Sequence, residues 1–163
     1  MVQIASPIIR QYDPSAKIVL FGGLNLWSGG DPNLALDTEF ARQLAALNVG
    51  QYGDAISVHA YPWMDQVKPL VWEKYNESLA YYNALFTDRP LEVWVTETGQ
   101  SIEADGEDGQ AQYMADAVQF FQGKVTRLFW YSLLDNAGDQ KSFGLIGNET
   151  RLAYSTLQKQ LTG

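Results

Sequence analysis

The side chains best suited to chemistry follow short apolar runs of the sequence, where predicted strands end. Cys is absent and His59 is the only histidine, which excludes disulfides, thiolate metal sites, a Cys nucleophile and any site that needs two imidazoles. Chemistry must therefore rest on carboxylates, hydroxyls and aromatic rings, and 13% of the residues are aromatic. The candidates are Asn25 and Trp27, His59 and Tyr61, Glu97, and Asp135 with Asn136.

His59 and Tyr61 are separated by one residue at the end of a predicted strand. Because successive side chains of a strand alternate between its faces, both are predicted to point to the same face. Glu97 follows the apolar run Val93–Val95 and would be held rigidly at the end of a buried strand. These positions predict one site at one edge of a sheet.

The elements that must position these side chains alternate four times between strand and helix. Strands are predicted at residues 17–22, 54–58, 91–96 and 125–131, where the sequence is apolar and rich in β-branched or aromatic residues. Helical spacing of apolar residues predicts helices at 2–12, after Asp31-Pro32, at 69–86, around Tyr113–Phe121 and at 151–161. The predicted apolar faces of the first three helices are Ile4, Ile8 and Ile9; Leu36, Phe40, Leu44 and Leu47; and Trp72, Tyr75, Leu79, Tyr82 and Phe86. Apolar strands separated by amphipathic helices favour an α/β fold with a parallel sheet covered by helices.

Two architectures satisfy this pattern. A doubly wound sheet usually carries a Gly-rich turn such as G-x-G-x-x-G after its first strand, and this sequence has none. In a β/α barrel the functional residues gather in the loops after the strands, as the candidates do here. A complete barrel needs about 250 residues and eight strands. The sequence therefore predicts a half barrel, with residues 1–163 as a single domain.

The sequence resembles the carboxyl-terminal half, strands five to eight, of a clan A TIM-barrel glycoside hydrolase. In this superfamily the acid/base and the nucleophile follow barrel strands four and seven. Four strings carry the resemblance, in the right order and at the right spacing: DPSAKIVL at 13–20 before Gly22-Gly23, DAISVHAYP at 54–62, VWVTETG at 93–99, and LFWYSLLD at 128–135 followed by FGLI at 143–146.

The resemblance implies roles for individual residues. Glu97 would be the nucleophile of a retaining mechanism, with the Tyr61 hydroxyl against its carboxylate and His59 near the sugar. Trp130 would be the platform for the sugar that is cleaved, since the C–H faces of sugars pack on aromatic rings. The other predicted substrate contacts are Trp27, Trp63, Asn25 and Asp135.

The acid/base of the family follows strand four, which this chain does not contain. A half barrel also leaves two unpaired strand edges and an uncovered inner face. Either an amino-terminal half closes the barrel, or two copies of the chain do so. In a dimer Asp135 would be the carboxylate able to replace the missing acid, and otherwise it caps the turn with Asn136. A half barrel that binds carbohydrate without turnover, or forms a purely structural unit, is the alternative function.

Composition excludes several other classes of partner. The net charge of −8 repels phosphate backbones and anionic lipid, so neither a nucleic acid nor a membrane is expected as a partner. The chain starts without the charged and apolar regions of a signal peptide, and secretion is expected only if the parent enzyme degrades a polysaccharide. No cofactor or metal is predicted, because the acidic segment Asp105–Asp108 is best explained as a solvated helix start.

Overall fold

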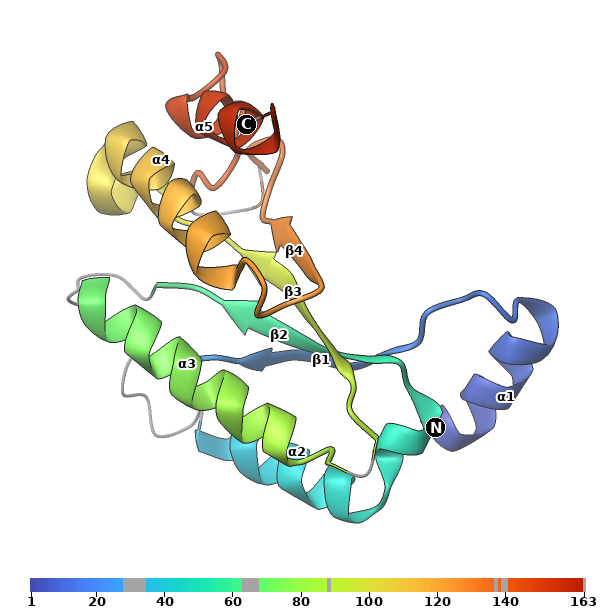
Figure 1. Cartoon of the computed structure of the whole chain (residues 1–163). Helices are drawn as coiled ribbons and strands as arrows, with labels where there is room; N and C mark the ends of the chain where they lie inside the picture. The colour runs from blue at the N-terminus through green and yellow to red at the C-terminus, as the bar shows by residue number, and fades with distance from the viewer. Residues whose placement is uncertain (28–34, 63–67, 88, 137, 139–140, 163) are drawn as a thin grey trace.

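The protein is built around one four-stranded parallel sheet (Figure 1). The computed structural model describes residues 1–27, 35–62, 68–87, 89–136, 138 and 141–162. The strands are β1 (Val19–Asn25), β2 (Ala55–Ala60), β3 (Glu92–Thr98) and β4 (Arg127–Trp130), paired in the order β1-β2-β3-β4. Each neighbouring pair is parallel, which confirms the predicted arrangement of four parallel strands.

The first three strands extend further toward their carboxyl ends than the apolar runs predict. β1 ends at Asn25, β2 at Ala60 and β3 at Thr98, two or three residues beyond the predicted limits. The reason is that the polar residues at these ends take part in strand pairing, as His59 does with Glu97. The candidate site therefore stands largely on strands rather than on loops.

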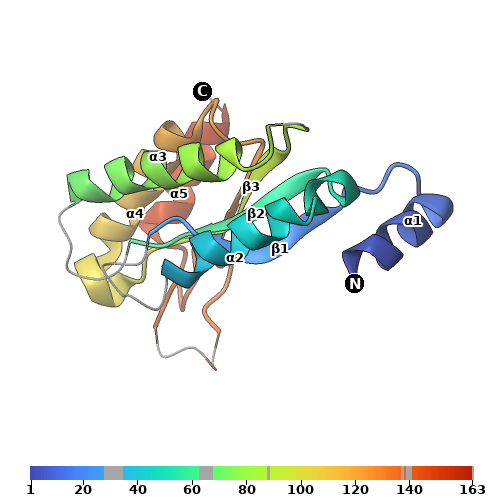
Figure 2. The ribbon, with the colours of Figure 1, turned by 90° about the horizontal axis from the view of Figure 1, so that it is seen from below.

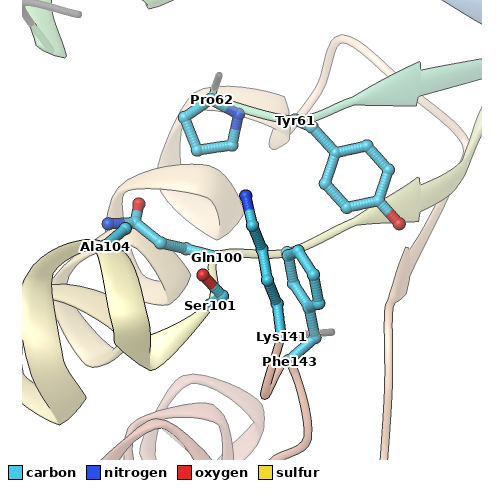
Figure 3. A pocket seen from close by; sticks show the side chains of 8 residues that line it. Tyr61, Pro62, Gln100, Ser101, Ala104, Lys141 and Phe143 are labelled. Atoms are coloured by element: carbon cyan, nitrogen blue, oxygen red, sulfur yellow. The ribbon is translucent and has the colours of Figure 1, made fainter. Parts of the chain in front are cut away.

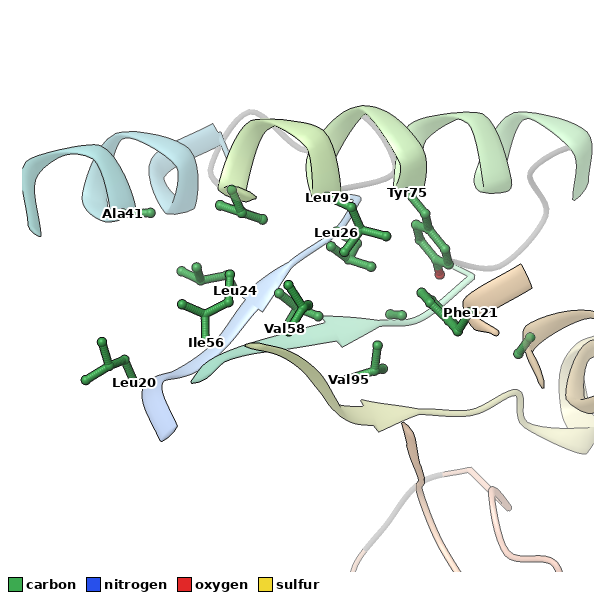
Figure 4. Close-up of a cluster of buried hydrophobic side chains, with 14 of the residues drawn as sticks. Leu20, Leu24, Leu26, Ala41, Ile56, Val58, Tyr75, Leu79, Val95 and Phe121 are labelled. Carbon is green, nitrogen blue, oxygen red and sulfur yellow. The ribbon is translucent and has the colours of Figure 1, made fainter. Parts of the chain in front are cut away.

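Helices cover the outer face of the sheet, defined here as the face that carries Val58, Ala60, Val95 and Thr98. They are α2 (Ala35–Ala46), α3 (Lys68–Ala84), α4 (Ile102–Phe121) and α5 (Leu152–Thr162), with a 3-10 turn at Val49–Tyr52. Figure 4 shows Tyr75 and Leu79 pointing from α3 toward the sheet, Leu79 next to Leu26 and Tyr75 next to Phe121. Tyr75, Tyr82 and Phe121 are fully buried in this layer, as their helical spacing predicts.

Two helices depart from their predicted apolar faces. In α2 the buried residue is Ala41, whereas Phe40 and Leu47 are exposed, so the predicted stripe through those two residues is wrong. In α1 (Val2–Tyr12) Ile4 and Ile8 are exposed, at 71% and 50%. Figures 1 and 2 show α1 set apart from the other helices. Among the described residues, no helix combines the length and apolar character needed to cross a membrane.

Asp54 joins α1 to the start of the sheet. Its carboxylate accepts two hydrogen bonds of 2.9 Å from the Arg10 guanidinium and one of 2.8 Å from the Ile18 N–H. Burial raises the pKa of Asp54, but the Ile18 N–H and the Arg10 guanidinium outweigh burial and hold this pKa below its ordinary value of 3.8. The carboxylate therefore stabilises the fold in its ionised form.

We expect Asp54→Asn to lower the free energy of unfolding by about 1–2 kcal/mol at neutral pH, because charge-assisted hydrogen bonds to the carboxylate are lost. The loss is no larger because Arg10 is partly exposed, so water screens its attraction to Asp54. Since the pKa is lowered on folding, this stabilisation is complete above the unfolded pKa and is lost as the pH falls through the folded pKa. Urea unfolding of both proteins at neutral and acidic pH measures the difference. Glu39→Gln on the surface of α2 is the control, with little expected change. A difference between wild type and Asp54→Asn that stays constant at pH values well below 3.8 would contradict this account.

Candidate active site

A register shift in β3 places Glu97 on the inner face of the sheet, defined here as the face that carries Ser57, His59 and Thr96. Val58 pairs with Val95, but the next residue of β2, His59, pairs with Glu97, so β3 has one extra residue. β4 shows the same shift, because Leu128 pairs with Val95 and Trp130 with Thr98. Such bulges re-aim a side chain. Without the extra residue, alternation from Val95 would direct Glu97 to the outer face.

The Glu97 carboxylate is held by two side chains of the β2 end. The Tyr61 hydroxyl donates a hydrogen bond of 3.0 Å to Oε2 of Glu97, and Nδ1 of His59 lies 3.6 Å from the same oxygen. The Glu97 side chain nevertheless remains 41% exposed. The predicted trio of Glu97, His59 and Tyr61 is therefore brought together, with the carboxylate accessible to a ligand.

The Tyr61 hydroxyl acts as the hydrogen-bond donor to Glu97 and stays protonated. Burial, followed by the hydrogen bond to Glu97, raises the pKa of Tyr61 far above its ordinary value of 10.0. The hydroxyl is therefore protonated across the whole working range of pH. Tyr61 is therefore a permanent hydrogen-bond donor to Oε2 of Glu97.

Gly23 allows His59 its position. A Cβ atom at residue 23 would lie 2.1 Å from Nε2 of His59, so the β1 backbone lies directly against the imidazole. The φ angle of Gly23 is +103°, in a region that favours glycine. The sequence carried no signal for this role beyond the paired glycines after the first apolar run.

The other predicted substrate contacts near β1 and β2 have different surroundings. Asn25 is paired in register with His59, but its side chain donates to Asp37 of α2 over 2.8 Å. Trp27 is half-buried and packs against the main core. Trp63 lies outside the described residues. Their roles in binding sugar stay predictions.

Trp130 packs on the outer face of the sheet. Its ring lies 6.0 Å from that of Tyr113 on α4, and its Nε1 donates to the Phe143 carbonyl over 3.2 Å. It pairs in register with Thr98, whose hydroxyl also contacts Tyr113. This orientation gives Trp130 a packing role on the face opposite Glu97, which does not favour its predicted use as a sugar platform.

An aromatic row that sequence reasoning missed extends from Tyr61 across the loop after β4. The Phe143 ring lies 5.8 Å from that of Tyr61 and 5.9 Å from that of Tyr131. Tyr131 follows Trp130, so alternation along the strand could have indicated that Tyr131, and not Trp130, belongs to the inner face. The position of Phe143 depends on a loop and had no comparable signal.

Asp135 is engaged by Arg151. The guanidinium donates to both carboxylate oxygens, over 2.9 Å to Oδ1 and 2.5 Å to Oδ2, and the Gly144 N–H donates to Oδ1 over 2.9 Å. The Arg151 guanidinium holds the pKa of Asp135 below its ordinary value. A general acid needs a raised pKa, so the structure argues against Asp135 as the replacement acid. The alternative role in the turn finds support, because Asp135 accepts from the Gly144 N–H and Oδ1 of Asn136 accepts from the Gly138 N–H over 3.1 Å.

The described part of the chain holds no group of three or more His, Asp or Glu side chains arranged for a metal ion. The site consists instead of one accessible carboxylate, its tyrosine donor and an imidazole, at the carboxyl ends of parallel β/α strands. This arrangement is typical of the catalytic face of β/α-barrel enzymes.

Comparison with known families agrees with this class. A model of the glycosyl hydrolase catalytic core matches residues 17–154, which include the four strands and the whole candidate site. The chain therefore belongs to the glycosyl hydrolase catalytic core family. A comparison with curated protein sequences finds no match.

Solved structures of glycoside hydrolases share the fold. A family 39 glycoside hydrolase from Bacteroides cellulosilyticus WH2 matches with 19% identity and a TM-score of 0.66, over 94% of this chain and 34% of that one. An endo-1,4-beta-D-xylanase from Clostridium thermocellum matches with 18% identity and a TM-score of 0.65, over 97% of this chain and 32% of that one. A family 128 endo-beta-1,3-glucanase from Amycolatopsis mediterranei matches with 19% identity and a TM-score of 0.58, over 95% of this chain and 63% of that one. The chain thus spans about a third of the length of the first two proteins. The predicted half barrel is confirmed as its fold.

We expect Gly23→Ala to displace the His59 ring and to lower the free energy of unfolding by about 1–3 kcal/mol, because a methyl group would overlap the imidazole and the φ angle would be strained. Gly22→Ala is the matched control, since a Cβ at residue 22 meets nothing within 4 Å. Proton NMR of the single histidine and thermal unfolding report the two effects. An unchanged imidazole spectrum in Gly23→Ala would refute the close approach.

Proposed function

We propose that this chain is the nucleophile half of a retaining glycoside hydrolase that acts on β-linked poly- or oligosaccharides. The observation that supports this most is the accessible Glu97 carboxylate on the inner face, with the Tyr61 hydroxyl 3.0 Å from Oε2. A retaining enzyme needs one carboxylate as nucleophile, ionised and rigidly held. Glu97 is accessible to a ligand, and the Tyr61 hydroxyl orients its Oε2.

In the proposed reaction a Glu97 oxygen attacks the anomeric carbon as the bond to the leaving oxygen breaks. The leaving oxygen takes a proton from a carboxylic acid, and water then hydrolyses the glycosyl ester with that group acting as base. Tyr61 keeps its proton throughout and orients the attacking oxygen. His59 contacts the sugar, and Tyr131 offers an aromatic face on the inner side in place of Trp130.

The acid/base is best supplied by an amino-terminal half barrel, whether it belongs to the same polypeptide or to another. Closing the barrel would pair the outer edges of β1 and β4 and would bring a strand-four carboxylate to the inner face. A homodimer could also close the barrel, but the carboxylate it would contribute is Asp135, whose lowered pKa and contact with Arg151 disfavour proton donation. We therefore favour the amino-terminal half barrel over a second copy of this chain.

Glycosides with a dinitrophenolate leaving group test the nucleophile without the missing acid, because this leaving group departs without protonation. We expect a 2-deoxy-2-fluoro glycoside of this kind, from a panel of β-linked sugars, to add one glycosyl group to Glu97. Intact mass and peptide mapping detect the adduct. Glu97→Gln should prevent formation of the adduct, while Glu107→Gln, at an exposed position of α4, should not. Labelling at another residue would reject Glu97, and absence of labelling with every glycoside would favour binding without turnover.

Tyr61→Phe should slow this labelling by about 10- to 100-fold, because one fixed donor to the reacting carboxylate is lost. The aromatic packing of Tyr61 against Phe143 is retained in the variant, so stability should change little. Tyr81→Phe is the matched control, since the Tyr81 hydroxyl of α3 donates to the Thr38 carbonyl of α2, in the helical layer on the face opposite Glu97. Equal labelling rates in wild type and Tyr61→Phe would remove Tyr61 from the mechanism.

A further inference from the structure

A cavity of about 180 Å³ lies beside the Glu97 site, among the loops that follow β2, β3 and β4. Figure 3 shows Tyr61 and Phe143 on one side, Gln100 and Ala104 on another, and Lys141 extending between them. A single water needs roughly 10–15 Å³ of such space, and pockets for drug-sized ligands start at about 300 Å³. The cavity is therefore of the size expected for one small ring.

Its walls offer what a sugar ring needs. The rings of Tyr61 and Phe143 stand at 74° to each other with centroids 5.8 Å apart, so they form an apolar corner. C–H faces of sugars pack on such rings. Lys141 is the charged residue among the described side chains that line the cavity. Its ammonium has three N–H donors, so it can donate to a sugar hydroxyl in addition to its contacts within the protein.

The lining is fixed by buried contacts beneath it. The Gln110 side-chain amide, fully buried on α4, donates to the Gln100 carbonyl over 2.9 Å and to the Phe143 carbonyl over 3.3 Å. It thereby ties the loop after β3 to the loop after β4. The Gln100 amide in turn donates to Asp105 over 2.6 Å. The cavity is thus preorganised, which reduces the entropic cost of binding.

Tyr61 connects the cavity to the nucleophile. One side of its ring lines the cavity, while its hydroxyl donates to Glu97. We propose that the cavity binds one neutral sugar ring, as a subsite next to the sugar that Glu97 attacks. The role of the cavity as a subsite rests on the proposed function, whereas its binding of a saccharide does not. A neutral sugar is favoured because the described lining is largely apolar and its one charged side chain, Lys141, already has contacts within the protein.

Titration of the full chain with cellobiose, xylobiose and laminaribiose, followed by amide NMR, tests this proposal. We expect saturable shifts at Gln100, Ser101 and Ala104 with at least one of these probes. Ala104→Leu should fill the cavity and weaken binding by about tenfold or more. Ala80→Leu, at an exposed position of α3, is the matched control and should bind as wild type does.

Further variants separate the possible failures. Glu97→Gln should bind the same probe with shifts at the same residues, so a cavity that binds sugar while Glu97 is never labelled would retain this proposal and reject only the hydrolase. Lys141→Met should weaken binding several-fold. Absence of binding by all three disaccharides, undiminished affinity in Ala104→Leu, or tighter binding of glucuronic acid than of the neutral probes would overturn the proposal.

Discussion

One extra residue in β3 decides which face of the sheet carries Glu97. Between Val95 and Thr98 the strand advances by three residues while β2 and β4 advance by two. The insertion directs Glu97 to the inner face and Thr98 to the outer face. On the outer face the Thr98 hydroxyl donates to the Ala60 carbonyl over 2.6 Å, and the Tyr113 hydroxyl donates to the same carbonyl over 2.9 Å. These buried contacts fix the strand ends directly behind Glu97.

The bulge also explains why the three key side chains meet. Tyr61 and His59 belong to β2 and the residues directly after it, so their common face follows from the two-residue period of a strand. Glu97 reaches them only because the register shift pairs it with His59. Gly23 of β1 completes the arrangement by leaving room for the imidazole of His59. Three adjacent strands thus contribute to the position of one carboxylate.

The sequence predicted the parts of this site that depend on periodicity and missed those that depend on register and loops. The four parallel strands and the buried Tyr75, Tyr82 and Phe121 follow from apolar spacing, and the trio of Glu97, His59 and Tyr61 followed from the resemblance. Trp130 was expected near the sugar, but β4 directs it to α4, and Tyr131 has the inner position. No local pattern could show that Phe143 would pack on Tyr61, because a loop whose path depends on Gln110 and Arg151 places it there.

The two faces of the sheet carry separate properties of the protein. The outer face forms a continuous core with α2, α3 and α4, and burial of apolar side chains there stabilises the half barrel. The inner face carries Glu97 and His59, with the exposed Phe129 of β4 at its edge. Stability therefore resides in the packed outer face, while the inner face keeps the Glu97 carboxylate accessible. Two carboxylates near the ends of β3 and β4 thus differ in their surroundings, because Asp135 is held by the Arg151 guanidinium whereas Glu97 accepts one hydrogen bond from Tyr61 and remains open to a ligand.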